Sequence, residues 1–185
     1  HMITSLLRLI VDPYANPEVL HHLVSPRWRI GPRDLATVSR RARDLATGPD
    51  GAVGSTSLLD AVRDPGDPDR YPLSAEARER LAAFSAELDL VTRDRSVAET
   101  VAATIEILAP GIVPVDSATL PPSFAALTAL AQGFRGVSGG RTLADFVAYL
   151  DDCRRFSASP EEPHTGGGVG ITVMTMHAAK GLEFP

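Results

Sequence analysis

The sequence predicts a mainly α-helical protein, and three observations lead to this prediction. Apolar residues recur at three- and four-residue spacing through most of the chain up to about residue 156, as they do on one face of a helix. Residue types that start and stop helices flank these stretches. Only one segment, at 169–176, alternates side chains in the manner of a strand.

Two short helices are expected near the N-terminus. Apolar residues between Leu6 and Ile10 indicate the first, which Asp12-Pro13 stops. In the second, Pro17 takes the first helical position after Asn16. Ser25-Pro26 ends it, because the residue before a proline is pushed out of the helical region.

A third helix is expected after Gly31-Pro32, and a short fourth one follows between two loops. The apolar face of the third helix carries Leu35, Val38, Ala42 and Leu45, and its other face carries Arg33, Arg40, Arg41 and Arg43. Residues 47–54 and 64–72 are rich in Gly, Pro and Asp, which predicts loops around a short helix near Leu58–Val62.

Four longer helices should complete the helical region. Ser74 caps one whose inward residues are Leu81, Phe84, Leu88 and Val91. Ser96 and Glu99 form a capping box for the next, which Gly111 ends. The last two run from about Pro122 to Phe134 and from a cap made by Thr142 and Asp145, the latter with Phe146, Leu150 and Cys153 on its apolar side.

The composition changes after the helical region. Residues 157–168 contain Pro, Gly, Ser and acidic residues without apolar periodicity, which predicts a linker, and the strand follows. We therefore expect a helical unit at 3–156, a linker at 157–168 and the start of a second domain at 169–185. Because the chain stops directly after a strand-like run, we expect it to be a piece of a longer protein.

Composition excludes several classes of protein. Hydrophobic residues make up 44% of the 185 residues, which argues against disorder throughout, and no apolar run is long enough to span a membrane. The single cysteine, Cys153, excludes an internal disulfide framework and agrees with a reducing compartment such as the cytoplasm. The net charge of −5 argues against nucleic-acid binding through bulk charge but leaves local basic patches open.

Familiar catalytic and metal-binding patterns are not found. The glycine-rich segment 136–142 follows a helix rather than a strand and lacks the lysine of a phosphate-binding loop. His21 and His22 have no ligand four residues further along the helix, so a zinc site is not expected, nor is any other metal site. Cys153 is interpreted as a small buried hydrophobic residue rather than a nucleophile. No catalytic residue is assigned.

The segment Ser25–Asp34 is the first candidate for function. Arg27, Arg29 and Arg33 surround one tryptophan at a turn that leads into a helix N-terminus. Backbone N–H groups and the helix dipole favour phosphate at such a position, and guanidinium groups add charge-assisted hydrogen bonds. The alternative is a structural turn with Trp28 packed inward and the arginines in solvent.

The second candidate lies at the end of the chain. A strand leads into a turn that carries His177, Lys180 and Glu183 within seven residues. Strand ends are where α/β proteins place ligand sites. The histidine and lysine can contact phosphate, and the glutamate can accept a hydrogen bond from a ribose hydroxyl.

The residues VMTMHAAKGLEFP (173–185) closely resemble motif V of the superfamily 1A DNA helicases, the UvrD/PcrA/Rep group. Residues 6–35 are similar to the start of the 2B subdomain of that family, where two helices lead to a Pro-x-Arg-Gly-Ile-Gly turn. Arg29 stands where the first of these glycines is expected, whereas Ile30 and Gly31 match. The middle, about 47–156, matches only as a run of helices.

The resemblance implies a helical 2B-type subdomain inserted in a RecA-like domain, of which the C-terminal strand is a truncated part. It also implies that the 25–33 turn touches duplex DNA. His177 would contact a phosphate of the translocating single strand, with Thr175 and Lys180 supporting that turn. Glu183 would meet the ribose of ATP, with Gly181 allowing close approach.

The function implied is therefore that of a fragment of an ATP-dependent 3′-to-5′ DNA helicase acting in repair or recombination. ATP and Mg²⁺ would bind the parent protein, whose partners would be DNA and, if it is a helicase–nuclease, a partner subunit. The fragment alone should be inactive, since Walker A, Walker B and motif VI lie outside it. The alternative is a helical protein-interaction module in which Arg27, Trp28 and Arg29 anchor a partner protein.

Overall fold

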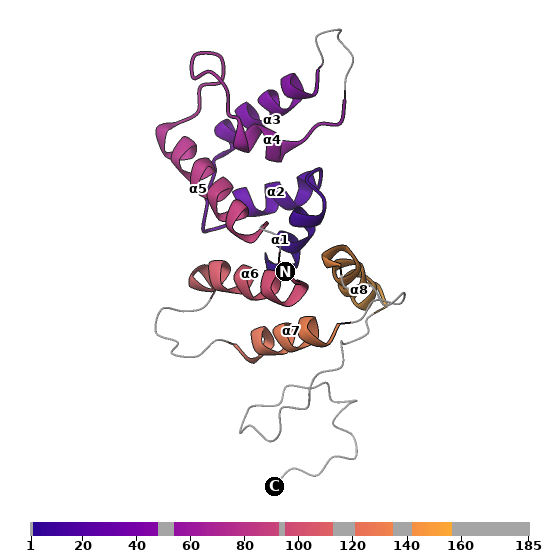
Figure 1. Ribbon diagram of the computed structural model, residues 1–185. Helices are drawn as coiled ribbons and strands as arrows, with labels where there is room; N and C mark the ends of the chain where they lie inside the picture. Colours follow the sequence, from indigo (N-terminus) through magenta and orange to yellow (C-terminus); the bar gives the residue numbers. More distant parts are fainter. Residues whose placement is uncertain (1, 48–53, 93–94, 113–120, 135–141, 157–185) are drawn as a thin grey trace, which may run out of the picture.

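The computed structural model describes residues 2–47, 54–92, 95–112, 121–134 and 142–156, and these residues are mainly helical (Figure 1). Its helices are α1 (Met2–Val11), α2 (Asn16–Leu23), α3 (Pro32–Ala46), α4 (Leu58–Arg63), α5 (Ala75–Val91), α6 (Val97–Ile112), α7 (Pro122–Gly133) and α8 (Leu143–Arg155). The predicted helical class is thus confirmed for this part of the chain. The expected linker and strand, 157–185, lie outside it.

Helices α1 and α2 occupy the middle of the molecule (Figure 1). Helices α3, α4 and α5 lie on one side of them, and α6 and α7 lie on the other, with α8 beside α1. α1 packs against α2, α6 and α8, whereas α4 packs against α2, α3 and α5. The two halves are therefore joined by α1, which packs against α2 and α6, and by direct packing of α5 against α6.

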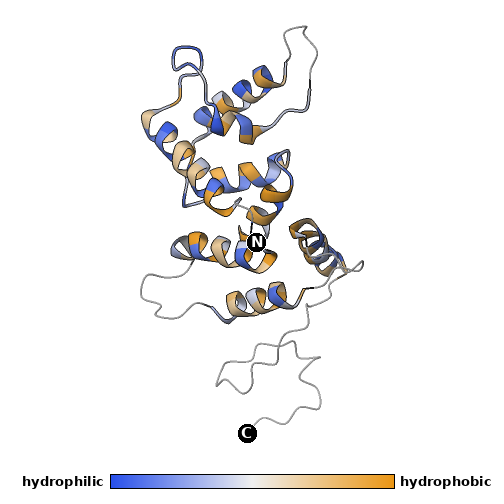
Figure 2. Ribbon diagram, in the orientation of Figure 1, coloured by the Kyte–Doolittle hydropathy of each residue, from blue (hydrophilic) through white to orange (hydrophobic). Residues whose placement is uncertain are grey.

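One hydrophobic cluster runs through both halves of the fold. Leu7 of α1, Leu81 of α5 and Phe146 of α8 are fully enclosed, although they are far apart in sequence. Hydrophobic residues, orange in Figure 2, alternate with hydrophilic ones along the helices. The inward face predicted for α5 is confirmed, since Leu81, Phe84, Leu88 and Val91 are all buried.

The caps predicted for three helices are present. The side chain of Ser74 accepts a hydrogen bond from the Ala77 N–H at the start of α5. The capping boxes of α6 and α8 form as expected, with Ser96 paired to Glu99 and Thr142 paired to Asp145. Such reciprocal bonds satisfy N–H groups that the first turn of a helix leaves free.

Two helix ends differ from the prediction by one residue. α2 begins at Asn16 with Ala15 as its cap, because the Asn16 side chain is used elsewhere: it donates to the Thr56 carbonyl and accepts from the Leu58 N–H. α6 continues through Gly111 to Ile112, since glycine disfavours helical dihedrals by only about 1 kcal/mol.

Some side chains predicted to lie inside are less buried than expected, and two near helix C-termini are examples. Leu45, near the end of α3, is 38% exposed, and Cys153, near the end of α8, is only partly buried. Both lie in the last turn or two of a helix, where fewer neighbouring elements remain to cover the apolar face.

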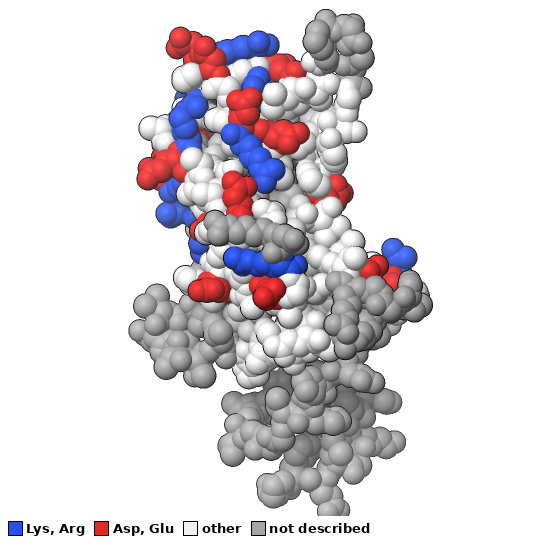
Figure 3. All heavy atoms as spheres, viewed as in Figure 1, with Lys and Arg blue, Asp and Glu red and all other residues white. Residues whose placement is uncertain are grey.

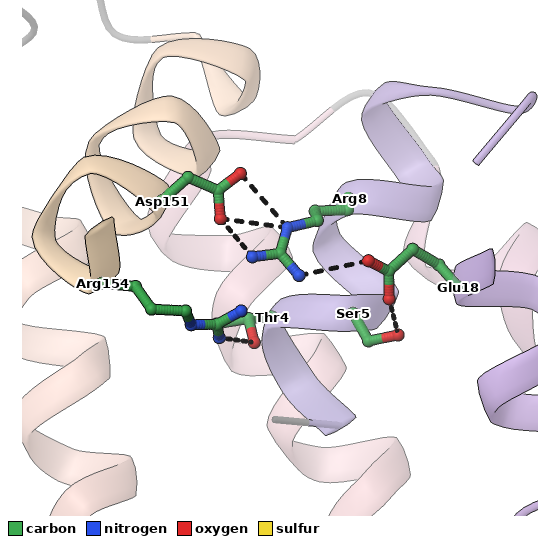
Figure 4. A network of polar contacts seen from close by, with 6 residues as sticks. All are labelled: Thr4, Ser5, Arg8, Glu18, Asp151 and Arg154. Atoms are coloured by element: carbon green, nitrogen blue, oxygen red, sulfur yellow. Dashed lines mark hydrogen bonds and ion pairs between the residues drawn. The ribbon is translucent and has the colours of Figure 1, made fainter.

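A polar network fastens the last helix to the first two (Figure 4). The Arg8 Nε of α1 donates to Asp151 of α8 at 3.0 Å, and its Nη1 donates to Glu18 of α2 at 3.1 Å. Ser5 also donates to Glu18, and Arg154 donates to Thr4. The two carboxylates raise the pKa of Arg8, chiefly through the hydrogen bond to Asp151, so its charge is fixed.

Candidate nucleic-acid interface at the Ser25–Arg33 turn

The chain reverses between α2 and α3 through a turn closed by backbone hydrogen bonds. The Ser25 carbonyl accepts from the N–H groups of Trp28 at 3.2 Å and Arg29 at 2.8 Å. The Ile30 N–H donates to the Leu23 carbonyl at 2.9 Å. The turn is therefore folded onto the end of α2 and has a defined shape.

Apolar side chains hold the underside of the turn against α5. Trp28 is 6% exposed and Ile30 is 4% exposed. The Trp28 ring meets the Phe84 ring edge-on, with 5.4 Å between the ring centroids. Trp28 therefore packs inward, as expected for the alternative of a structural turn.

Arg29 lies at the top of the turn in a left-handed backbone conformation, with a φ of 45°. Among the described residues, no other residue besides glycine has a positive φ. A side chain makes this conformation costly, by roughly 1–2 kcal/mol. The Arg29 carbonyl accepts a hydrogen bond from Arg80 Nη1 of α5 at 3.1 Å, while its own side chain is exposed.

The turn ends at the start of α3. Gly31 is the N-cap, Pro32 stands in the first turn, and no side chain caps this helix. The N–H groups of a first helical turn lack intrahelical partners and carry a partial positive charge. Gly31 has an extended backbone and a Cβ there would meet no atom, so the described surroundings do not themselves demand glycine.

The Arg27 side chain is bound within the protein. Its guanidinium forms an ion pair with Glu87 of α5 at 2.5 Å and lies 5.5 Å from the centre of the Trp28 ring. Arg29 and Arg33, in contrast, have exposed side chains. The structure therefore places Arg80 against the Arg29 carbonyl, leaves Arg29 and Arg33 exposed on either side of Gly31, and uses Arg27 to brace the turn.

Acidic side chains limit the charge of this surface. Glu76 pairs with Arg80, Glu87 pairs with Arg27, and Asp34 accepts from the backbone and hydroxyl of Ser74. Basic and acidic groups are interspersed over α3, α4 and α5 (Figure 3). An anion at this surface would therefore interact with individual arginine side chains rather than with a large patch of positive charge.

A buried histidine lies under the turn. His22 of α2 is fully enclosed, its ring is 5.9 Å from that of Phe84, and neither ring nitrogen has a hydrogen-bond partner among the described residues. Ser25 Oγ is likewise buried and unpartnered there. Burial, assisted by the nearby His21, lowers the pKa of His22 to about 4.

Sequence patterns alone missed Arg80 and the role of Phe84. Both belong to α5, some fifty positions from the turn, and only their helical spacing was visible. The predicted residues Thr175, His177, Lys180, Gly181 and Glu183 lie outside the described part of the chain. In that described part, no group of three or more His, Cys, Asp or Glu could hold a metal ion.

Comparisons with known proteins assign no family to the chain. No protein-family model matches it, and no curated protein matches it. None of the helices in the described ranges combines the length and apolar character needed to cross a membrane.

Proposed function

We propose that this chain is part of an ATP-dependent 3′-to-5′ DNA helicase similar to the UvrD/PcrA/Rep group, and that its 25–33 turn contacts duplex DNA. The observation that carries the proposal is the left-handed conformation of Arg29. The helicase pattern has a glycine at this position, and glycine is the residue that adopts such a conformation without strain. The motif at 173–185 supports the same assignment from the sequence.

In this proposal, the arginines and the helix start act together on the DNA backbone. Arg29 and Arg33 are exposed on either side of Gly31, at the uncapped start of α3. Phosphate contacts of this kind fix the position of a protein on a duplex without reading its sequence. Trp28 and Arg27 keep the turn rigid, so the contact geometry exists before DNA arrives.

The remaining roles belong to the parent protein. ATP and Mg²⁺ would bind there, and no described residue is assigned to either. His177 and Lys180 would follow the single strand as the motor domains close, and Glu183 would meet the nucleotide. The 2B-type part would grip or sense the duplex and regulate unwinding.

The alternative, a module that anchors a partner protein through Arg27, Trp28 and Arg29, gains no support from the turn. An anchor residue must be able to enter a pocket of the partner. Trp28 is instead buried against Phe84, and Arg27 is paired with Glu87. Only Arg29 of the three is exposed.

Fluorescence anisotropy with a labelled DNA duplex tests the proposal. We expect Arg29→Glu and Arg33→Glu each to weaken binding severalfold in low salt. Each should also reduce the slope of log affinity against log salt by roughly one, as expected for a lost phosphate contact. Arg155→Glu, a matched charge change at the exposed end of α8, should have a much smaller effect.

Duplex affinity that is unchanged by both turn variants, or that falls equally with Arg155→Glu, would contradict the DNA contact. Circular dichroism of each variant excludes loss of folding as the cause.

A further inference from the structure

A concave surface lies between α4 and α5. It has a volume of about 330 Å³. Val62 and Pro65 on one side and Ala82 and Ala86 on the other make most of it apolar. Arg78 is the basic residue that α5 contributes to it.

The guanidinium of Arg78 lacks a partner in this pocket. Its Nη2 atom is buried and has no hydrogen-bond acceptor among the described residues. A buried guanidinium donor without an acceptor lowers stability, because its hydrogen bonds to water are lost and no others replace them. Among the described residues, Arg78 is therefore the basic residue of this pocket that remains available to an acceptor.

The charges around the pocket define what kind of acceptor fits. Arg63 and Asp89 line the pocket as an ion pair, with 3.2 Å between Nη2 and Oδ1, and so cancel each other. Arg78 therefore leaves one positive charge. A group with a single negative charge would balance it, whereas a doubly charged phosphate would leave excess negative charge beside Asp89.

We propose that the pocket between α4 and α5 binds a monocarboxylate with a short apolar body. The carboxylate accepts hydrogen bonds from Arg78, since its planar pair of oxygens matches the fork of a guanidinium. The apolar body lies against Val62, Pro65 and Ala86. The same chemistry is offered by a small carboxylic acid and by the C-terminal carboxylate of a peptide that ends in an apolar residue.

This pocket is independent of the proposed DNA contact. Arg78, Ala82 and Asp89 follow one another at helical spacing along one face of α5. Arg80, which contacts the turn, is displaced from Arg78 by about 200° around the helix axis. Loss of one function therefore need not affect the other.

Titration by ¹H–¹⁵N NMR of the full chain tests the proposal with hexanoate and N-acetyl-leucine as probes. We expect saturable shifts of the amide signals of Val62, Ala82 and Ser85 with at least one of them. Stronger binding of hexanoate would identify a small acid as the source, and stronger binding of N-acetyl-leucine would identify a peptide C-terminus. Arg78→Met should weaken this binding at least about tenfold, because it keeps the side chain's bulk but removes its charge.

Three controls make the result decisive. N-acetyl-leucinamide lacks the carboxylate, inorganic phosphate carries the wrong charge, and Arg95→Met removes an exposed arginine that does not line the pocket. Saturation by the amide or by phosphate to the same degree would overturn the proposal. So would absence of saturable shifts with both probes, or equal weakening by Arg95→Met in folded protein.

Discussion

Arg29 combines an exposed positive charge with a backbone conformation that favours glycine. These properties can be separated by substitution. The charge serves the proposed contact with DNA, whereas the left-handed conformation is a cost to the fold. Strain of this kind persists only where the surroundings hold it, here through Arg80 and the packed ring of Trp28.

We predict that Arg29→Gly stabilises the protein by about 0.5–1 kcal/mol while weakening duplex binding. Relief of the left-handed strain is partly offset by the greater freedom of glycine in the unfolded chain. Arg29→Ala is the matched control: it removes the charge but keeps a Cβ, so it should weaken binding without the gain in stability. Urea denaturation measures the first effect and anisotropy the second. Equal stabilities of the two variants would show that the turn is not strained.

His22 makes stability depend on pH at the residue scale. In the unfolded chain its pKa is near 6.5, and in the folded protein it is about 4. The folded state therefore excludes the proton, and this contribution to stability is complete above pH 6.5. It decreases as the pH falls toward 4, by about 3 kcal/mol in total.

We predict that urea denaturation of the unchanged chain shows this loss between pH 6.5 and 4, and that His22→Leu removes most of it. Leucine has no titrating group and fills the same enclosed space. His21→Leu, which changes the exposed neighbour, should reduce the pH dependence only slightly, because burial is the larger cause of the lowered pKa of His22. A His22→Leu variant with the full pH dependence would assign the effect to the carboxylates instead.

At the scale of elements, α8 returns to the start of the chain and is held there by charge as well as by apolar packing. Phe146 of α8 is fully buried, and Asp151 is joined to Arg8 of α1. Arg8 also donates a hydrogen bond to Glu18 of α2, so this one side chain connects α1, α2 and α8 (Figure 4). Because the two carboxylates share one cation, its removal leaves Asp151 without this partner and leaves Glu18 with the hydrogen bond from Ser5.

We predict that Arg8→Met destabilises the protein by about 1–2 kcal/mol. The methionine keeps the apolar stem of the side chain, so the loss reflects the missing hydrogen bonds from Arg8 to two partly buried carboxylates. Thermal or urea denaturation measures the change. Arg155→Met, at the exposed end of the same α8 helix, should change stability by less than about 0.5 kcal/mol. Similar losses in both variants would mean that the network contributes little.

At the scale of the whole molecule, the proposed activities lie on different faces of one helical scaffold. The turn that begins α3 and the pocket beside α4 are both supported by α5. Neither is the machinery for phosphoryl transfer, which needs a phosphate-cradling lysine, a metal-binding carboxylate and an arginine finger. The proposal assigns that machinery to the parent protein.

We therefore predict that the purified chain releases no more phosphate from ATP than a buffer control, with or without DNA. A colorimetric phosphate assay measures this. Residual activity that is the same in a Lys180→Ala and Glu183→Ala variant would identify a contaminating enzyme. Hydrolysis that disappears in that variant would contradict the proposal that the chain is only a fragment of the motor.

The sequence by itself determined the helical class and most helix positions, because periodicity and caps act over a few neighbouring residues. The inward face of α5 and the capping box of Thr142 with Asp145 are examples. It also placed the arginines at a turn before a helix. Where a helix end was misjudged, as at Asn16, the side chain had bonded to a distant segment.

Only the tertiary structure decided how these residues are used. Arg27 and Arg29 are two positions apart in sequence, yet the Arg27 side chain is paired with Glu87 of α5 and the Arg29 side chain is exposed. The enclosure of His22 and the unpartnered Nη2 of Arg78 likewise depend on packing between helices. Periodicity indicates which face of a helix is buried, but the pairing of charges and the enclosure of single polar groups depend on contacts between distant segments.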